Sequence, residues 1–326
     1  MTVDEFAAEW HNDCTYIEAI TSGSTGAPKT IRLSKKDMIA SALATNEFFN
    51  LKEGDNFICP MDFKYIGAKM MYVRAQIAKG NVVALPPSNV FRFDETAHLL
   101  ALVPSQVDNL VENPDLICRT KHLIIGGAAL SDVRAERLIK AGIDAYVTYG
   151  MTETASHVAL AKVGHDVFTA LPGVSFEKDK RDCLIINMLG RDSSRVVTND
   201  IVELLSQHRF KWLGRYDNII NSGGIKIIPE LIESAVKSFL NSIHFQYSDV
   251  AVVKGESEKW GEQAVCLIET SVQLGEEDVK ALKAELKLSL DDPRKCPDRI
   301  LCIKELPRTA NGKIDRLSEN LRKFAT

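Results

Sequence analysis

The stretch Thr21-Ser22-Gly23-Ser24-Thr25-Gly26-Ala27-Pro28-Lys29 is the most informative part of this sequence. Its two glycines let backbone N–H groups come close to an anion, and successive N–H groups in a turn form a concave nest for phosphate oxygens. Ser22, Ser24 and Thr25 add hydroxyl donors, and Lys29 adds a positive charge. We therefore expect a polyphosphate-binding loop here, with a polar turn between two strands as the plainer alternative.

This loop differs from the Walker A loop of P-loop ATPases. Counting from Gly23, the Walker pattern requires a glycine where Pro28 stands. A Walker nest also uses the backbone N–H at that position, and proline has none. The sequence therefore argues against a P-loop ATPase.

The composition is typical of a globular protein with about two domains. The chain has 326 residues, 45% of them hydrophobic, and a formal net charge of −4. That charge gives no support for a nucleic-acid partner, which normally requires a basic patch. We see no apolar run long enough for a membrane span and no secretory signal in the first ten residues. The seven cysteines form no CxxC pair, so we expect reduced thiols and a cytoplasmic protein.

The order of expected elements indicates an α/β fold. Strand-like runs alternate with helical runs, which favours a layer of parallel strands. The expected strands cover residues 56–61, 81–85, 122–125 and 144–148. The expected helices cover residues 66–79, 96–102, 107–111 and 132–141, with another beginning at a near capping box, Ser34-Lys35-Lys36-Asp37.

The character of the sequence changes near residue 218. Short strands and turns are expected over residues 174–213. A small α+β module follows, with expected helices over residues 230–240 and 276–290 and expected strands over residues 250–254, 263–269 and 300–303. We therefore predict a large N-terminal α/β domain over residues 1–216 and a small, mobile C-terminal α+β domain over residues 217–326.

Four further clusters follow the glycine loop in order. Tyr149-Gly150-Met151-Thr152-Glu153-Thr154 comes directly after an expected strand, where ligands of open α/β sheets bind. Thr198-Asn199-Asp200 places a carboxylate in an expected loop, which is also a common turn pattern. The segment 214–233 contains Gly214-Arg215-Tyr216-Asp217 and Gly223-Gly224. The last cluster is Pro307-Arg308-Thr309-Ala310-Asn311-Gly312-Lys313-Ile314-Asp315-Arg316.

Together these motifs resemble the adenylate-forming superfamily, which contains acyl- and aryl-CoA ligases, peptide-synthetase adenylation domains and luciferases. The resemblance runs from Thr21 to Arg316, which is nearly the whole chain. It implies an acid–CoA ligase in which a carboxylate attacks the α-phosphate of ATP, and CoA then displaces AMP. Phosphoryl-type chemistry of this kind depends mainly on charge neutralisation and positioning.

The resemblance also implies roles for individual residues. The ATP-binding set would be Thr21, Ser22, Gly23, Ser24, Thr25, Gly26, Lys29, Gly126, Gly127, Ala128, Tyr149 and Asp200. The catalytic set would be Thr152, Glu153, Arg215 and Lys313, with Glu153 holding Mg²⁺ and Lys313 bridging the carboxylate and the α-phosphate. Asp217 would be the hinge of the rotating C-terminal domain, and Gly223 and Gly224 would line the channel for the pantetheine arm of CoA.

Three departures from the superfamily pattern bear on the substrate. First, the glycine loop begins at residue 21, so we expect a shortened first subdomain. Second, Asn199 stands where the family usually has glycine. Third, the aromatic-His segment that usually precedes the acyl pocket is not recognisable in this sequence. The short N-terminus and the residues from Tyr149 to His157 most resemble bacterial o-succinylbenzoate–CoA ligases of menaquinone synthesis.

That substrate keeps a second carboxylate, which needs a cation or several donors if it is partly buried. Lys69 and Arg74 lie on one expected helix and are candidates for this role, and His157 is a third candidate for the acyl pocket. The alternative is that both cations lie on a solvated helix face and that His157 is simply packed or exposed.

Two other functions remain open from the sequence. The enzyme could transfer its acyl group to the thiol of a carrier protein, or the chain could be a non-catalytic nucleotide-binding remnant of a ligase. Retention of Lys29, Glu153, Asp200, Arg215 and Lys313 argues against a remnant. The expected small molecules are a carboxylic acid, ATP, Mg²⁺ and CoA, and the sequence leaves a homodimer open.

Overall fold

The computed structural model describes residues 1–21, 29–309, 314–316, 318, 321 and 324. The chain forms two compact units. The N-terminal unit comprises residues 1–179, 184–198 and 203–212, and the C-terminal unit comprises residues 180–183, 199–202 and 213–326. Each unit has its own hydrophobic core.

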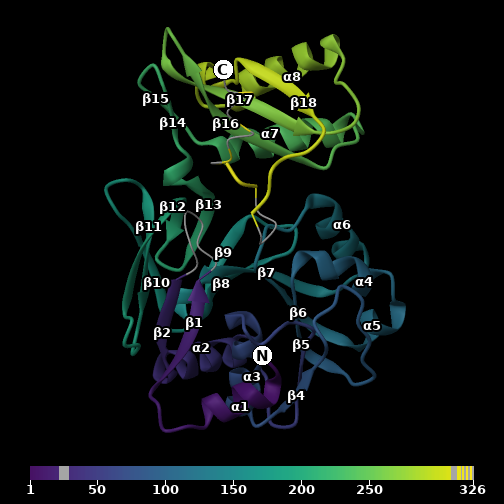
Figure 1. Cartoon of the computed structure of the whole chain (residues 1–326), viewed down its shortest axis with the longest axis vertical. Helices are drawn as coiled ribbons and strands as arrows, with labels where there is room; N and C mark the ends of the chain where they lie inside the picture. Colours follow the sequence, from purple (N-terminus) through teal and green to yellow (C-terminus); the bar gives the residue numbers. More distant parts are fainter. Residues whose placement is uncertain (22–28, 310–313, 317, 319–320, 322–323, 325–326) are drawn as a thin grey trace. The chain divides into compact units, whose positions relative to one another are not determined.

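The N-terminal unit contains a parallel sheet whose neighbouring strands follow the order β4-β3-β5-β6-β7. Beyond β7 the sheet continues antiparallel through β8 and β9. Figure 1 shows β4 to β9 within this unit. Their bounds are Asn56–Cys59 (β3), Asn81–Ala84 (β4), Ala97–Leu102 (β5), Thr120–Ile125 (β6), Asp144–Met151 (β7), Ser156–Lys162 (β8) and Val167–Ala170 (β9).

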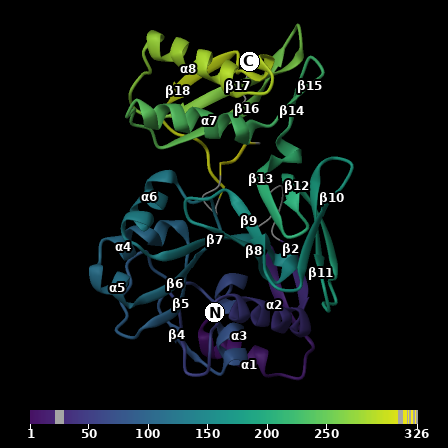
Figure 2. The same cartoon turned by 180° about the vertical axis from the view of Figure 1, so that it is seen from behind.

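Helices cover both faces of the parallel strands. Alternating side chains of one strand enter different cores, because successive residues of a strand point to opposite faces: Leu99 packs in one core and Leu100 in the other. The first core includes α1 (Val3–Trp10), α2 (Lys35–Phe48) and α3 (Ile66–Ala78), and the second includes α4 (Val107–Val111), α5 (Pro114–Arg119) and α6 (Asp132–Lys140). In Figure 2, which views the molecule from behind, α4 to α6 lie on the left and α1 to α3 lie towards the lower right.

The large sheet has four further strands among the described residues, namely β10 (Val174–Lys178), β11 (Cys183–Met188), β12 (Arg195–Ser206) and β13 (Arg209–Arg215). Of these, β10 pairs antiparallel with β11, and β13 pairs antiparallel with β9. A separate hairpin of β1 (Tyr16–Thr21) and β2 (Lys29–Ser34) has Thr21 opposite Lys29, so the glycine-rich stretch connects its two strands.

The helix expected over residues 96–102 is wrong, because this segment is strand β5. Its sequence, Ala-His-Leu-Leu-Ala-Leu, consists largely of good helix formers. In the fold β5 lies between β3 and β6 and buries both faces. Such a central parallel strand has a nearly continuous apolar sequence, so its pattern resembles that of a short buried helix.

The capping box expected at Ser34 is also absent. Ser34 is the N-cap residue of α2, but its hydroxyl makes no cap hydrogen bond and donates to Asp192 at 2.7 Å. The Asp37 carboxylate accepts the backbone N–H groups of Asp192 and Ser193 at 2.6 and 3.0 Å. The side chains at the start of α2 therefore bond to the loop at residues 192–193 of the same unit, and Ser34 does not cap the helix.

The C-terminal unit is an α+β module. Its sheet has the order β15-β14-β17-β16, with β18 parallel to β17. The strands are Ile220–Ser222 (β14), Ile225–Ile227 (β15), Asp249–Ser257 (β16), Gly261–Glu269 (β17) and Arg299–Ile303 (β18), and the helices are Pro229–Ser242 (α7) and Glu276–Ser289 (α8). Both helices pack on one face through Val236, Leu240, Leu282 and Leu286. No helix in the described parts of the chain is long and apolar enough to cross a membrane.

Gly150 is required by the close approach of β7 and β8. A Cβ atom there would lie 2.4 Å from the Ser156 carbonyl oxygen and 2.5 Å from the His157 Cα, and backbone atoms cannot move aside easily. We expect Gly150→Ala to lower the free energy of unfolding by about 1–3 kcal/mol, as overpacking does. Gly67→Ala in α3 is the matched control, because its Cβ would meet only Met61 at 3.8 Å. Urea unfolding of both variants tests this, and equal stability would contradict it.

Candidate active site

The ends of β6 and β7 bring two of the predicted segments together. Gly126 follows β6, and a Cβ atom on it would lie 2.4 Å from Thr148 Oγ1 in β7. The Thr148 hydroxyl donates to the Ile125 carbonyl at 3.2 Å, and Gly127 has a φ of +89° that favours glycine. Because β6 and β7 are parallel neighbours, residues 126–128 and the segment from Tyr149 lie at one carboxyl edge of the sheet.

Tyr149 lies in an aromatic group at this edge. Its ring centroid is 5.6 Å from that of Phe168 and 5.0 Å from that of Phe210, and the Tyr149 side chain is half-buried. Edge and tilted contacts of this kind fix the orientation of a ring. These contacts hold the Tyr149 ring at the carboxyl edge of the sheet, and its stacking on a nucleotide base stays a prediction.

The Thr-Glu motif forms a short turn after β7. Thr152 and Glu153 lie on the 3₁₀ turn η2 (Thr152–Thr154), where Glu153 is exposed and the Thr154 hydroxyl accepts the Met151 backbone N–H at 3.0 Å. The next two residues, Ala155 and Ser156, have φ values of +52° and +90°. Left-handed conformations at non-glycine residues are costly and occur often at functional sites.

An exposed carboxylate on this turn is suited to Mg²⁺. Magnesium in nucleotide sites is usually held by one or two carboxylates together with phosphate oxygens. Glu153 is an exposed carboxylate of this kind, and its role in holding Mg²⁺ stays a prediction. Among the described residues, no group of three or more His, Cys, Asp or Glu side chains is arranged to hold a metal ion.

Arg74 is a buried cation without a carboxylate partner among the described residues. Its side chain is 1% exposed, and Nη2 lies 3.2 Å from the Ser156 hydroxyl and 3.3 Å from His157 Nδ1. Its Nε has no hydrogen-bond partner. Burial lowers the pKa of Arg74 to about 9. Burial thus opposes the charge of this guanidinium, and no carboxylate among the described residues offsets that effect.

His157 supports this guanidinium through a defined chain of hydrogen bonds. Arginine nitrogens only donate, so His157 Nδ1 accepts and its proton lies on Nε2. Nε2 then donates to Thr45 Oγ1 at 3.1 Å, and the Thr45 hydroxyl donates to the Ser41 carbonyl at 3.1 Å. Burial lowers the pKa of His157 well below 6.5, and the nearby Arg74 and Arg191 charges lower it further. The imidazole is therefore neutral with one fixed tautomer.

This buried neutral histidine makes stability depend on pH. Below its unfolded pKa the unfolded chain takes up a proton that the folded chain does not, so stability is lost as the pH falls from about 6.5. We expect His157→Gln to reduce the slope of unfolding free energy between pH 6 and pH 5 by up to about 1.4 kcal/mol per pH unit. Urea unfolding at several pH values measures this slope. His165→Gln, at an exposed position, is the control, and an unchanged slope in His157→Gln would contradict the assignment.

Lys69 lies on the same helix as Arg74 but makes different contacts. Its side chain is 3% exposed, and Nζ donates to Glu9 Oε2 at 3.1 Å and to the Glu18 carbonyl at 3.0 Å. The alternative of a solvated helix face is therefore wrong for both cations. Because Lys69 already has a carboxylate partner, the contacts favour Arg74 over Lys69 as the cation for a substrate carboxylate.

In the C-terminal unit, the structure brings Asp200, Arg215 and Asp217 together. Arg215 Nη1 lies 3.4 Å from Asp200 Oδ1, and its Nη2 lies 2.7 Å from Asp217 Oδ2. Asn199, the departure from the family's glycine, donates to Asp217 at 3.1 Å and accepts from Arg181 at 2.9 Å. Burial opposes the charge of Arg215, but the two carboxylates outweigh it and raise the pKa of Arg215. These side chains form one charged cluster.

Gly223 and Gly224 form the turn of the β14–β15 hairpin. Their φ values of +54° and +85° fit a two-residue turn with both central residues left-handed, which favours glycine. A Cβ atom on Gly223 would lie 2.6 Å from the Trp260 ring. The turn and this packing account for both glycines, and their place in a CoA channel stays a prediction.

Several predicted site residues lie outside the described residues or only at their border. Thr21 is the last residue of β1, and Lys29 is the first residue of β2. Ser22, Gly23, Ser24, Thr25, Gly26 and Lys313 are not described. Sequence reasoning did not assign roles to Thr45, Ser156 or Arg181, because their importance comes from partners 18 or more positions away.

Comparison with known proteins gives the class of this chain. The family model described as AMP-binding enzyme matches residues 6–179, and the model described as AMP-binding enzyme C-terminal domain matches residues 238–313. The chain therefore belongs to the AMP-binding enzyme family. The predicted resemblance to adenylate-forming enzymes and the predicted α/β fold with a smaller C-terminal domain are confirmed.

Two curated relatives are similar to this chain at modest sequence identity. The 2-succinylbenzoate–CoA ligase of Haemophilus influenzae is 25% identical over 274 residues, which are 77% of this chain and 58% of the relative. The 2-succinylbenzoate–CoA ligase of Listeria monocytogenes is 25% identical over 96% of this chain and 71% of the relative. The chain thus spans less than two thirds of the first of these ligases.

Two solved structures have the same fold. An acyl-CoA synthetase (AMP-forming)/AMP-acid ligase II-like protein from Dyadobacter fermentans is 28% identical, with a TM-score of 0.62 over 96% of this chain and 91% of that chain. MenE of E. coli with a bound analogue of OSB-AMS is 20% identical, with a TM-score of 0.71 over 94% of this chain and 68% of that chain.

Proposed function

We propose that this protein is an AMP-forming acid–CoA ligase whose substrate is o-succinylbenzoate, as in menaquinone synthesis. In the first step a carboxylate oxygen of the acid attacks the α-phosphorus of ATP, and pyrophosphate leaves. In the second step the CoA thiol sulfur attacks the acyl carbonyl, the thiol proton is released, and AMP leaves. Membership of the AMP-binding enzyme family supports the use of ATP.

The N-terminal unit would bind the nucleotide. The glycine loop between β1 and β2 would hold the β- and γ-phosphates, residues 126–128 would contact adenine, and Tyr149 would stack on the base. Thr152 would contact the α-phosphate, and Glu153 would hold Mg²⁺, whose charge offsets that of the phosphates.

The C-terminal unit would supply the remaining groups. Asp200 and Arg215 would hold the ribose hydroxyls, and the contact of Arg215 with Asp217 connects them to the proposed hinge. Lys313 would neutralise charge that develops between the attacking carboxylate and the α-phosphate. Because one site serves two steps, the C-terminal domain would rotate between them.

One observation supports this choice of acid. It is the buried guanidinium of Arg74, which contacts the residues that follow the Thr-Glu turn. Arg74 bonds Ser156 and His157, which follow Glu153 by three and four positions. An acid that keeps a second carboxylate would pair with this cation and gain a charge-assisted hydrogen bond. An acid with a single carboxylate would leave the charge unpaired.

The test is mass-spectrometric detection of acyl-CoA. The purified chain is given ATP, Mg²⁺ and CoA with o-succinylbenzoate, benzoate, acetate or a fatty acid in separate reactions. A thioester with o-succinylbenzoate alone supports the proposal, and a thioester with another acid keeps the reaction and rejects the substrate. Acid-dependent pyrophosphate release without a thioester would indicate a carrier-protein thiol as the acceptor. No adenylate with any acid would contradict the proposal.

A further inference from the structure

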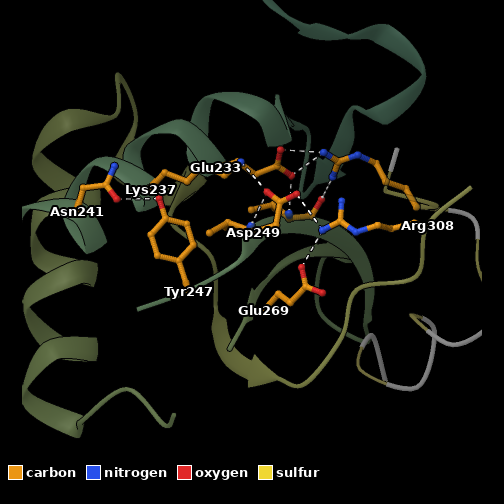
Figure 3. Close-up of polar contacts among 10 residues, drawn as sticks. Glu233, Lys237, Asn241, Tyr247, Asp249, Glu269 and Arg308 are labelled. Carbon is orange, nitrogen blue, oxygen red and sulfur yellow. Dashed lines mark hydrogen bonds and ion pairs between the residues drawn. The ribbon is translucent and has the colours of Figure 1, made fainter. Parts of the chain in front are cut away.

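Two arginines of the C-terminal unit lie on either side of the segment 309–313. Figure 3 shows the first of them, Arg308, facing Asp249 and Glu269. Its Nη2 lies 3.2 Å from Asp249 Oδ2 and 2.8 Å from Glu269 Oε2. Asp249 and Glu269 lie directly opposite each other in β16 and β17. Like charges at such positions repel, so the guanidinium between them is strongly favoured.

Both carboxylates are held by other groups. Glu269 is 8% exposed, and its Oε1 accepts the backbone N–H of Leu306 at 3.1 Å. Lys237 of α7 contacts Asp249 Oδ1 at 2.7 Å, as Figure 3 also shows. Arg308 is therefore attached to the sheet by partners that have little freedom to move.

The second arginine, Arg316, is attached at a different point. Its Nη2 lies 2.7 and 2.8 Å from the two carboxylate oxygens of Glu233 in α7, and its Nη1 donates to the Val252 carbonyl at 2.6 Å. Glu233 is 8% exposed and also accepts the Val252 backbone N–H at 2.6 Å. Helix α7, strand β16 and Arg316 thus form one connected network.

The backbone brings the two arginine-bearing ends together. Arg308 and Ile314 form an antiparallel bridge, and the Asp315 N–H donates to the Pro307 carbonyl at 2.8 Å. Residues 307–308 and 314–315, on the two sides of the segment 309–313, therefore lie next to each other. Both of its flanks are fixed to the C-terminal unit by charge pairs in which the carboxylates are largely buried.

We propose that Arg308 and Arg316 are positioning residues for acyl-adenylate formation, because they fix both ends of the segment that carries Lys313. This inference rests on the proposed function, in which Lys313 acts in the first step and not in the second. Neither arginine needs to touch the substrate. A small displacement of a reacting group lowers a rate strongly, so the flanks of a catalytic segment need rigid support.

The experiment compares the two half-reactions in Arg308→Gln and Arg316→Gln. Adenylation is measured as o-succinylbenzoate-dependent exchange of pyrophosphate into ATP, and the second step as CoA thioester formation from preformed o-succinylbenzoyl-adenylate. We expect exchange at saturating substrate to fall about tenfold or more, with unchanged KM for ATP, and thioester formation to stay within about twofold. Arg294→Gln, which removes an exposed pair with Asp292 in the same unit, is the matched control and should change neither step.

A second pair of variants distinguishes a loss of positioning from misfolding of the arginine variants. Glu269→Gln and Asp249→Asn keep Arg308 and weaken its anchor, so the same split between half-reactions is expected. The double variant Arg308→Gln/Glu269→Gln should be no slower than Arg308→Gln alone, because both changes remove one interaction. Equal losses in both half-reactions, or no loss of exchange, would overturn the inference. Failure of the wild-type protein to adenylate any acid would instead overturn the proposed function.

Discussion

Replacing Lys313 by alanine should slow acyl-adenylate formation by about a hundredfold or more while thioester formation from preformed adenylate changes by no more than severalfold. The reason is that removal of one group aimed at developing charge typically costs about 10²–10³ in rate. In the proposed mechanism this charge develops at the α-phosphorus during the first step only. Pre-steady-state measurement of adenylate formation and a separate thioester assay give the two rates.

The control for this prediction is Lys304→Ala. Lys304 is exposed and follows β18, so its removal changes the charge of the same unit without touching the segment 309–313. Both half-reactions should keep the wild-type rate in this variant. Equal loss in the two half-reactions of Lys313→Ala would contradict the role assigned to Lys313.

Replacing Arg74 by methionine should raise KM for o-succinylbenzoate by about ten- to a hundredfold. A hydrogen bond to a charged group contributes about 1.5–3 kcal/mol, and each 1.4 kcal/mol corresponds to about a tenfold change in affinity. Stability should be unchanged or higher, because a buried cation without a carboxylate partner is replaced by an apolar chain of similar length. Steady-state kinetics and urea unfolding measure the two effects.

The comparison variant is Lys69→Met, on the same helix and equally buried. Because Lys69 Nζ is bonded to Glu9, its removal leaves a carboxylate without its partner, so stability should fall and KM for the acid should change by less than about twofold. A reversed pattern, with KM raised by Lys69→Met and not by Arg74→Met, would assign the substrate carboxylate to Lys69.

The C-terminal helices and the strands after residue 249 were predictable because their signals are local. A charged amphipathic pattern predicted a helix from Glu276, and the structure has α8 from Glu276 to Ser289. Strand β5 was not predictable in the same way. Its residues carry no alternation, and only pairing with β3 and β6, which lie about 20 to 40 positions away, determines its conformation.

The candidate site shows the same division. The sequence predicted roles for Tyr149, Thr152 and Glu153, because nucleotide-binding chemistry places particular residue types at short, fixed spacings. It placed Lys69 and Arg74 on one helix but could not tell their environments apart. Their bonds to Glu9 and His157 join positions 60 and 83 residues apart, and no local pattern encodes such contacts.

The sequence by itself determined the family of this protein, the order of its motifs and most of its helices, because these depend on neighbouring residues. Only the tertiary structure decided that Arg74 is a buried cation behind the Thr-Glu turn, that His157 holds it as a neutral imidazole, and that Arg308 and Arg316 are anchored to separate carboxylates. Burial and charge pairing depend on which distant segments pack together. The free energy of a charged group is set by that packing and not by its position in the chain.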